Sequence, residues 1–373
     1  MATPVMANEK QAAASTPPAG PPPSTRRYLA LDAYRGFIML VLAAEGFGFP
    51  EIQQDPTWGR VAHWFMHVPW DGGVFWDMIQ PAFMFMVGVA MPFALARRAE
   101  LGATAHDNLR HVLVRALRLV ILSQILIWVS AGHIKPQLIN VLSQIAFTYV
   151  LSYFIMQWRW RYQAATAIAL LAGWTALFFL FPGPDGPFSP RNHMGLRVDR
   201  AIFHYDYDPA YSTLNFIPST VWTLAGVWAG RLLMGNKSHK ENLTKLGVGM
   251  ALSFVLAFAL RPWIPFIKQL CTASFILYSL GWVVFMLIGF YVLVEVRGYR
   301  RWTFPLVVVG MNSIFIYSLS MLLRHWLDRA VGVFTFRYTF IGTLAPVVQG
   351  CTVLFVMWSM CYWLYKRRIF LKV

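Results

Sequence analysis

Apolar residues in this chain of 373 residues gather into blocks of about 20 positions, separated by short polar segments. A helix of about 20 residues is long enough to cross the ~30 Å hydrocarbon core of a bilayer, and in lipid it satisfies its own backbone hydrogen bonds. Only 13% of the residues are charged, whereas a soluble domain carries charge on about a quarter of its positions. The sequence therefore predicts an all-α fold, a polytopic integral membrane helix bundle.

About ten membrane-spanning helices are expected. They are predicted near residues 36–50, 75–95, 113–130, 138–156, 164–182, 214–234, 246–261, 271–294, 303–323 and 339–364. Most of the 32 Lys and Arg residues fall in the two terminal tails and in the loops that this topology places on the same side. Because cytoplasmic loops are enriched in Lys and Arg, both termini are predicted to be cytoplasmic. The loop between the first two spans and the 183–213 loop are then outside.

Residues 1–25 are rich in Ala, Pro, Ser and Thr and contain no apolar core, so they predict a disordered cytoplasmic tail and no signal peptide. Residues 26–373 are predicted to form the transmembrane domain. The net charge of +16 does not indicate nucleic-acid binding, because the basic residues sit in short loops and not on one exposed face. Three cysteines, Cys271, Cys351 and Cys361, lie in apolar context without a CxxC motif, so neither a disulfide framework nor a metal site is expected.

The loop between the first two spans carries two histidines, in the segment His63-Trp-Phe-Met-His67-Val-Pro-Trp70-Asp71. A neutral imidazole near pH 7 can take a proton from an amine or hydroxyl and return it to a leaving group, so His67 is the main catalytic candidate. His63 lies on the same face as His67 if the segment is helical. Alternatively, these His and Trp side chains anchor the loop at the lipid headgroups.

Two acids lie near this loop. Glu45 is at the end of the first span and Asp77 opens the second. Ionisable groups at membrane depth are costly and usually face a cavity or a partner. Either carboxylate could orient His67 or bind a substrate. The alternatives are a helix N-cap for Asp77 and an ion pair with a loop arginine for Glu45.

Four further polar groups are candidates at membrane depth or at its edge. Asp32 and Arg35 open the first span, where they could pair with each other, or Arg35 could bind a phosphate. Asn312 and Ser313 interrupt an apolar span and could either hydrogen-bond between helices or line a pore. The 183–213 loop, with Asp199 and Asp208, is too long for a simple connector and suggests a lid or binding role.

Several segments together resemble the heparan-alpha-glucosaminide N-acetyltransferase family of transmembrane acyltransferases, in particular its bacterial relatives. The resemblance runs from about residue 26 to the C-terminus. It rests on Leu-Asp32-Ala-Tyr-Arg35-Gly, His67-x-x-Trp70-Asp-Gly, Asp77…Pro81…Phe83-x-Phe85…Gly88, Val-Asp199-Arg200, Tyr207-Asp208-Pro209, Leu-Ala-Gly226-Val-Trp-Ala-Gly230, Gly310-Met-Asn312-Ser313-Ile and the closing Tyr-Lys-Arg-Arg-Ile-Phe.

The resemblance implies a membrane enzyme that takes acetyl from cytoplasmic acetyl-CoA and places it on an amino sugar or other envelope glycan across the membrane. The catalytic histidine of the family corresponds to His67, with Glu45 and Asp77 as its expected helpers. Asp32 and Arg35 mark a cytoplasmic mouth suited to the CoA phosphates. Residues His63, Asp71, Asn312, Ser313, Asp199 and Asp208 are candidates for acceptor binding. A bacterial inner membrane is the expected location, with membrane lipids around the protein, and a homodimer is consistent with the resemblance.

The chain departs from the family pattern at three places. The family has an Asn near the end of the first span, where this chain reads Ala43-Ala44-Glu45-Gly46. A Gln-Arg pair of the family reads Ser143-Gln144 here, and a family His corresponds to Ser320. These differences bear on the acceptor and on activity.

Two other functions are open at this point. A proton-coupled transporter or flippase for a sugar or glycolipid would use Glu45, His67 and Asp77 as a relay; a scaffold without activity would use none of them. An acyltransferase would act directly, with His67 as general base, or through an acylated His67. Dependence on acetyl-CoA separates the enzyme from a carrier.

Overall fold

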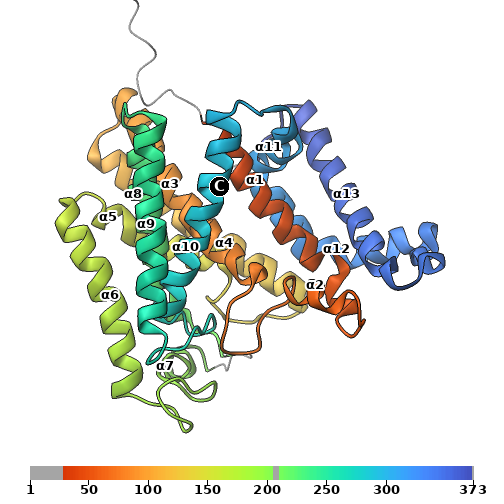
Figure 1. Cartoon of the computed structure of the whole chain (residues 1–373), viewed down its shortest axis with the longest axis horizontal. Coiled ribbons are helices and arrows are strands. Elements are labelled where there is room, and N and C mark those ends of the chain that lie inside the picture. Colours follow the sequence, from red (N-terminus) through yellow and green to blue (C-terminus); the bar gives the residue numbers. More distant parts are fainter. Residues whose placement is uncertain (1–27, 205–209, 372–373) are drawn as a thin grey trace, which may run out of the picture.

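The computed structural model describes residues 28–204 and 210–371, and in this part the chain forms helices joined by loops (Figure 1). The helices are α1 (Leu29–Ala44), α2 (Gly59–His63), α3 (Ile79–Glu100), α4 (Ala105–Ala131), α5 (Val141–Ile155), α6 (Trp160–Leu180), α7 (Met194–Phe203), α8 (Phe216–Met234), α9 (His239–Leu260), α10 (Ala273–Tyr291), α11 (Phe304–Met311), α12 (Ser313–Thr335) and α13 (Ala345–Lys366). The predicted tail, residues 1–25, lies outside the described residues.

Six helical segments in the described residues are long and apolar enough to cross a membrane. They are Phe75–Glu100, Ala105–Ala131, Trp160–Leu180, His239–Leu260, Ala273–Val296 and Ser313–Lys366, the last of which contains α12 and α13. These segments support the predicted polytopic membrane protein built from helices. The total of about ten spans and the cytoplasmic position of both termini stay predictions.

Close helix contacts through glycines hold the bundle together. A Cβ atom added to Gly88 of α3 would lie 1.9 Å from the Thr223 carbonyl oxygen of α8, and one added to Gly226 of α8 would lie 2.0 Å from the Phe85 carbonyl oxygen. The backbones of α3 and α8 therefore touch at a point where only hydrogen atoms fit. Small residues serve this purpose in membrane bundles, because helices in lipid associate by packing rather than by hydrophobic burial.

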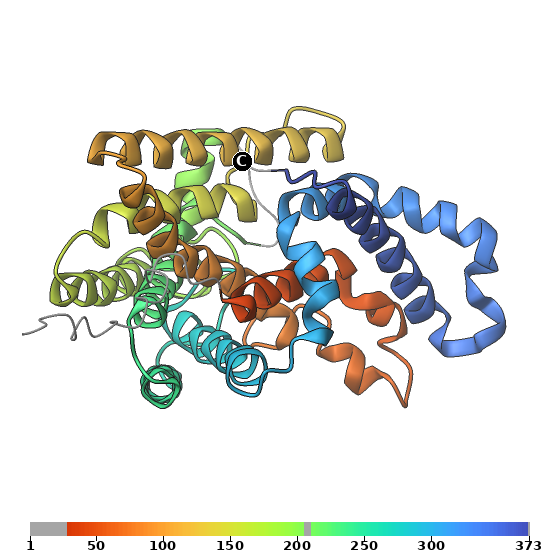
Figure 2. The ribbon, with the colours of Figure 1, turned by 90° about the horizontal axis from the view of Figure 1, so that it is seen from above.

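Helix α1 joins two groups of helices. On one side, the Tyr34 hydroxyl donates a hydrogen bond to the Val283 carbonyl of α10, at 3.0 Å. On the other side, a Cβ atom on Gly36 would lie 1.8 Å from the Leu306 carbonyl oxygen of α11. Viewed from above, α12 and α13 lie to one side of the molecule, and α4 lies along another edge (Figure 2). Helix α1 thus fixes the position of the α11–α13 group relative to the rest.

The helix ends differ from the predicted spans at several places. Helices α1, α4 and α9 begin at Leu29, Ala105 and His239, earlier than the predicted 36, 113 and 246, and three further differences have a cause in the backbone. Helix α1 ends at Ala44 rather than at residue 50, because Glu45, Gly46, Phe47 and Gly48 all take positive φ angles of 44–79°. The predicted span 303–323 is broken at Asn312 into α11 and α12, and α12 continues to Thr335. The predicted span 339–364 begins later, at Ala345, because the backbone of residues 336–344 includes positive φ angles that cannot continue an α-helix.

We expect Gly226→Leu to destabilise the protein by about 1–3 kcal/mol, because the new side chain forces α3 away from α8. Thermal unfolding of the purified protein in detergent measures this change. Gly249→Leu on α9 is the matched control, since a Cβ atom there meets no atom within 4 Å. Equal unfolding temperatures for the two variants would contradict the close contact between α3 and α8.

Candidate active site

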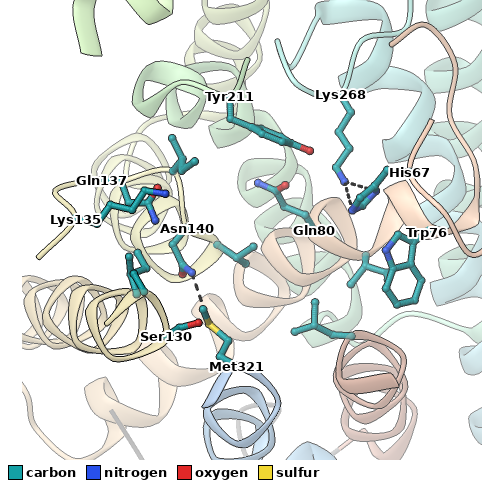
Figure 3. Close-up of a pocket in the computed structure, with 16 residues that line it drawn as sticks. His67, Trp76, Gln80, Ser130, Lys135, Gln137, Asn140, Tyr211, Lys268 and Met321 are labelled. Carbon is teal, nitrogen blue, oxygen red and sulfur yellow. Dashed lines mark hydrogen bonds between the residues drawn. The ribbon is translucent and has the colours of Figure 1, made fainter. Parts of the chain in front are cut away.

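A cavity of about 460 Å³, called the polar cavity here for the polar residues among its aliphatic and aromatic lining, has His67 in its wall (Figure 3). On one side of it are His67, Lys268 and Trp76, and Gln80 and Tyr211 lie near its centre (Figure 3). The facing side carries Ser130, Lys135, Gln137 and Asn140, from the end of α4, the loop after it and the start of α5. Amides, hydroxyls and aromatic rings thus surround a space large enough for a small polar ligand.

Three titratable side chains meet at one wall of this cavity. The Nδ1 atom of His67 lies 2.8 Å from Oδ1 of Asp77. The Nζ atom of Lys268 lies 2.9 Å from the same Nδ1 atom and 3.3 Å from the same Oδ1 atom. The predicted association of His67 with Asp77 is therefore present in the structure, and Lys268 completes it. We call these three residues the His67 cluster.

The three residues of the His67 cluster differ in their exposure to solvent. Asp77 is 1% exposed and Lys268 is 9% exposed, while the His67 side chain is 52% exposed. Burial lowers the pKa of Lys268, and the Asp77 carboxylate beside it acts in the opposite direction. In the tautomer with Nδ1–H, His67 donates a hydrogen bond to the Asp77 carboxylate and keeps a lone pair on Nε2, as a general base requires. In the other tautomer, Nδ1 instead accepts a hydrogen bond from the Lys268 ammonium.

The second carboxylate oxygen of Asp77 is held by the backbone. It accepts a hydrogen bond from the Val74 N–H at 3.3 Å. Asp77 belongs to the short 3₁₀ helix η3 (Phe75–Met78), which precedes α3, and Val74 is the residue before η3. Asp77 is the third residue of η3 and not the helix N-cap offered as an alternative, since Val74 is the N-cap of η3 and Met78 that of α3. One of its carboxylate oxygens bonds the Val74 backbone and the other contacts His67.

The loop that carries Lys268 is joined to the histidine loop by several hydrogen bonds. The Asp71 carboxylate accepts one from the Phe266 N–H at 3.0 Å, and the Gly72 N–H donates to the Phe266 carbonyl at 2.8 Å. The Gln269 amide donates to the Pro69 carbonyl at 3.2 Å. Asp71, predicted as an acceptor ligand, thus holds the two loops in register, and it also pairs with Arg261 at 3.4 Å.

Sequence reasoning missed Lys268. A signal for it is present, because it is a single cation in the apolar run Pro265-Phe-Ile-Lys268-Gln-Leu-Cys271, just before an apolar span. A lysine is rarely buried unless it is paired, so its position predicts a buried acid as partner. The sequence does not say which acid, because the Lys268–His67 separation is 201 residues.

His63 and Glu45 do not join the cluster. His63 is the last residue of α2, and the segment after it is irregular, so the two histidines do not share a helical face. Glu45 pairs with Arg324 of α12, at 3.0 Å. In the described residues, neither lines the cavity around His67. The ion pair expected as an alternative for Glu45 is observed, although its arginine lies on a helix and not on a loop.

Asn312 and Ser313 act within the bundle. The Asn312 amide donates to the Ile369 carbonyl at 3.2 Å and its oxygen accepts from the Leu371 N–H at 3.1 Å, so it holds the C-terminal segment. The Ser313 hydroxyl donates to the Gly310 carbonyl at 2.8 Å, at the break between α11 and α12. Neither contact is the bond between two helices that the sequence analysis offered as an alternative, because Asn312 bonds the segment after α13 and Ser313 bonds a carbonyl three residues away.

Asp32 and Arg35 lie at the start of α1 and pair with each other at 3.2 Å, as expected for residues three positions apart on a helix. Arg35 also donates to the Gly310 carbonyl at 3.0 Å. Ser143, a departure from the family pattern, donates to Ser123 of α4 at 2.9 Å, and Ser320 donates to the Tyr317 carbonyl at 2.8 Å. Both departures thus have local hydrogen-bond partners.

The described residues of the 183–213 loop include α7, and Tyr211 from this loop lines the cavity. Asp199 is buried and accepts a hydrogen bond from the Thr213 N–H at 2.8 Å, and burial raises the pKa of this carboxyl. His193 is buried and lies 2.9 Å from the Ala210 carbonyl through Nε2. Burial lowers the pKa of His193 to about 4. Asp208 lies outside the described residues.

Comparison with known proteins gives two relatives that carry the same name. The chain is similar to "Heparan-alpha-glucosaminide N-acetyltransferase" of Mus musculus, with 22% identity over 94% of this chain and 61% of the mouse protein. It is similar to the protein of that name from Homo sapiens, with 22% identity over 78% of this chain and 52% of the human protein. The chain therefore spans between half and about three fifths of the curated relatives' length. No protein-family model matches the chain.

We expect Asp77→Asn and Lys268→Met each to destabilise the protein, because each leaves a buried charge with less compensation. The double variant should lose about 1–3 kcal/mol less than the sum of the two single losses, because it removes both charges together. Unfolding in detergent, measured for all four proteins, gives this coupling. Additive losses would show that the two side chains do not interact.

The buried His193 predicts a pH-dependent opening of the loop. Because the unfolded-state pKa is about 6.5 and the folded-state pKa is about 4, the open loop binds more protons between these values. The loop is therefore fully stabilised above about pH 6.5 and loses up to about 3 kcal/mol as the pH falls to about 4. Hydrogen exchange of α7 should rise over this range in the wild type and change less in His193→Gln. An equal pH response of both proteins would contradict the assignment.

Proposed function

Because this chain belongs to the heparan-alpha-glucosaminide N-acetyltransferase-like family of membrane proteins, we propose that it is a membrane-bound acetyltransferase. In this proposal the protein takes an acetyl group from cytoplasmic acetyl-CoA and places it on an amino sugar or other envelope glycan at the outer face. The observation that carries the proposal is the His67 cluster at the wall of a polar cavity. A bacterial inner membrane is the proposed location.

His67 is the proposed general base. Its Nε2 lone pair accepts the proton of the acceptor amine or hydroxyl while the acceptor attacks the acetyl carbonyl carbon. The C–S bond of the thioester then breaks, and the imidazolium returns the proton to the departing CoA sulfur. The Asp77 carboxylate, 2.8 Å from Nδ1, stabilises the imidazolium during this interval. In the second route, His67 itself attacks the thioester and carries the acetyl group to the acceptor.

Lys268 is proposed as a positioning residue. Its Nζ atom lies 3.3 Å from the Asp77 carboxylate, so an ammonium there keeps the buried carboxylate ionised. In this proposal the ammonium, 2.9 Å from His67 Nδ1, donates to the carboxylate, and the ionised Asp77 accepts from Nδ1–H, so that Nε2 stays free. Loss of Lys268 is therefore expected to lower the rate without removing the reacting group.

The cavity suits a sugar as acceptor. Trp76 and Tyr211 offer aromatic rings on which the apolar face of a sugar ring can lie. Gln80, Gln137 and Asn140 offer amides for sugar hydroxyls. On the donor side, Asp32 and Arg35 mark the proposed cytoplasmic mouth, with the Arg35 guanidinium as the group suited to a CoA phosphate.

We expect purified protein in oriented vesicles to transfer label from [acetyl-¹⁴C]acetyl-CoA to at least one member of a panel of amino sugars. His67→Ala should lower the rate by a factor of about 10²–10⁴, the usual contribution of a general base. Lys268→Met should show a reduced kcat and an altered pH profile, whereas Lys268→Arg should retain part of the rate. Folding of each variant is checked by its unfolding temperature.

Label transfer that is equal in the wild type and His67→Ala would contradict the assignment of His67. Absence of both transfer and acetyl-CoA binding, in protein shown to be folded, would contradict the acetyltransferase proposal. Gradient-dependent sugar uptake without use of acetyl-CoA would instead support a transporter.

A further inference from the structure

A second, apolar groove of about 470 Å³ lies along α10, separate from the polar cavity. Its wall on α10 runs from Tyr278 to Phe290, and Leu293, in the π-helical turn η5 (Val292–Val296) that follows α10, continues it. The other walls are Phe37 of α1, the segment of Trp64, Val74, Phe75 and Met78, and Trp302 near the start of α11. Every lining residue is uncharged, and most are aromatic. Helix α10, which supplies most of the lining, lies next to α1 in the middle of Figure 1.

The lining residues of the groove extend along residues 278–293. Residues 278–293 of a helix rise about 22 Å at 1.5 Å per residue, which is most of the ~30 Å hydrocarbon core. A convex apolar surface touches lipid chains that exchange freely, whereas a concave groove contacts one chain on several sides. Since each close carbon–carbon contact adds about 0.1–0.2 kcal/mol, these contacts together favour a retained chain.

Gly289 lies in the wall of the groove, where its lack of a side chain leaves space. The glycine is exposed, and a Cβ atom built on it meets no other atom within 4 Å. The space above Gly289 is therefore available to a chain from outside the protein. It also means that a larger side chain at residue 289 would enter the groove without displacing any part of the protein.

One end of the groove is strongly basic. Trp302, which lines that end, is preceded by exposed Arg297, Arg300 and Arg301 in the segment between α10 and α11. This segment is predicted to be cytoplasmic, where anionic lipid headgroups attract each nearby Lys or Arg with about 1 kcal/mol. The opposite end, at Trp64 and Val74, is formed by the histidine loop. The apolar groove therefore has exposed basic residues close in the chain to Trp302 at one of its ends.

We propose that this groove binds one acyl chain of an anionic phospholipid, with the phosphate of its headgroup at Arg297, Arg300 and Arg301. The chain enters at Trp302 and lies along α10 past Gly289 toward Tyr278. This site is distinct from the proposed acetyl-transfer site and does not depend on that activity.

The test is native mass spectrometry of the detergent-purified full chain with phosphatidylglycerol or phosphatidylcholine of identical acyl chains. The wild type should retain phosphatidylglycerol at least about tenfold better than phosphatidylcholine, as expected for a few headgroup-facing arginines. Gly289→Leu should lose this retention because its side chain occupies the groove. Gly249→Leu, an equally exposed and open glycine on α9, is the matched control and should bind as the wild type does. Arg300→Gln combined with Arg301→Gln should remove the preference for phosphatidylglycerol.

Equal retention of phosphatidylglycerol by Gly289→Leu and by the wild type would overturn the proposal, as would equal retention of the two lipids by the wild type. An equal loss in Gly249→Leu and Gly289→Leu would show general contact with lipid and would also overturn it. A dimer that dissociates only in Gly289→Leu, without a difference in lipid retention, would assign the groove to a second copy of the chain.

Discussion

The end of the bundle that carries the His67 cluster depends on how two opposite charges, Asp77 and Lys268, are accommodated away from water. Removing a charge from water costs several kcal/mol, and a nearby opposite charge recovers this cost only if the geometry is good. The 3.3 Å contact between them exists because the two loops are joined backbone to backbone at Phe266 and Gly72. Asp71, which accepts the Phe266 N–H, therefore supports the pair although it does not touch His67. The exposed His67 imidazole is thus held by the buried pair of Asp77 and Lys268.

Packing of the helices places these loops. The direct backbone contact of α3 with α8, at Gly88 and Gly226, sets the position of the start of α3, and Asp77 lies immediately before that start. Helix α1 contacts α10 through Tyr34, and the loop of Lys268 leads directly into α10. The distance between Asp77 and Lys268 is thus determined at points well inside the bundle. A substitution at one of these glycines would therefore move Asp77 relative to Lys268 by shifting whole helices, without altering a residue of the cavity wall.

Much of this architecture was readable from the sequence, and the parts that were not have physical causes. Apolar blocks predicted the helices, and the ten-residue spacing of His67 and Asp77 placed both at one mouth. The break at Asn312 was not predicted, because an amide inside an apolar run fits a continuous helix equally well. Lys268 was missed because its partners are distant in the sequence, and only folding brings them together. The end of α1 was placed too late because apolar composition continues through Phe49, while the backbone turns at Glu45.

The pairing of Glu45 with Arg324 also bears on the departure from the family pattern at this position. An acid in place of an amide at the end of α1 brings a charge to membrane depth, and such a charge requires a partner. Arg324 supplies it at 3.0 Å and also donates to the Ala43 carbonyl at 2.8 Å, so it caps the same helix end that Glu45 begins to unwind. The charge of Glu45 is therefore compensated between α1 and α12. Among the residues of α1, Leu42 lines the cavity and Glu45 does not. Because His67, Asp77 and Lys268 are assembled from other segments, the acid at residue 45 leaves the His67 cluster intact.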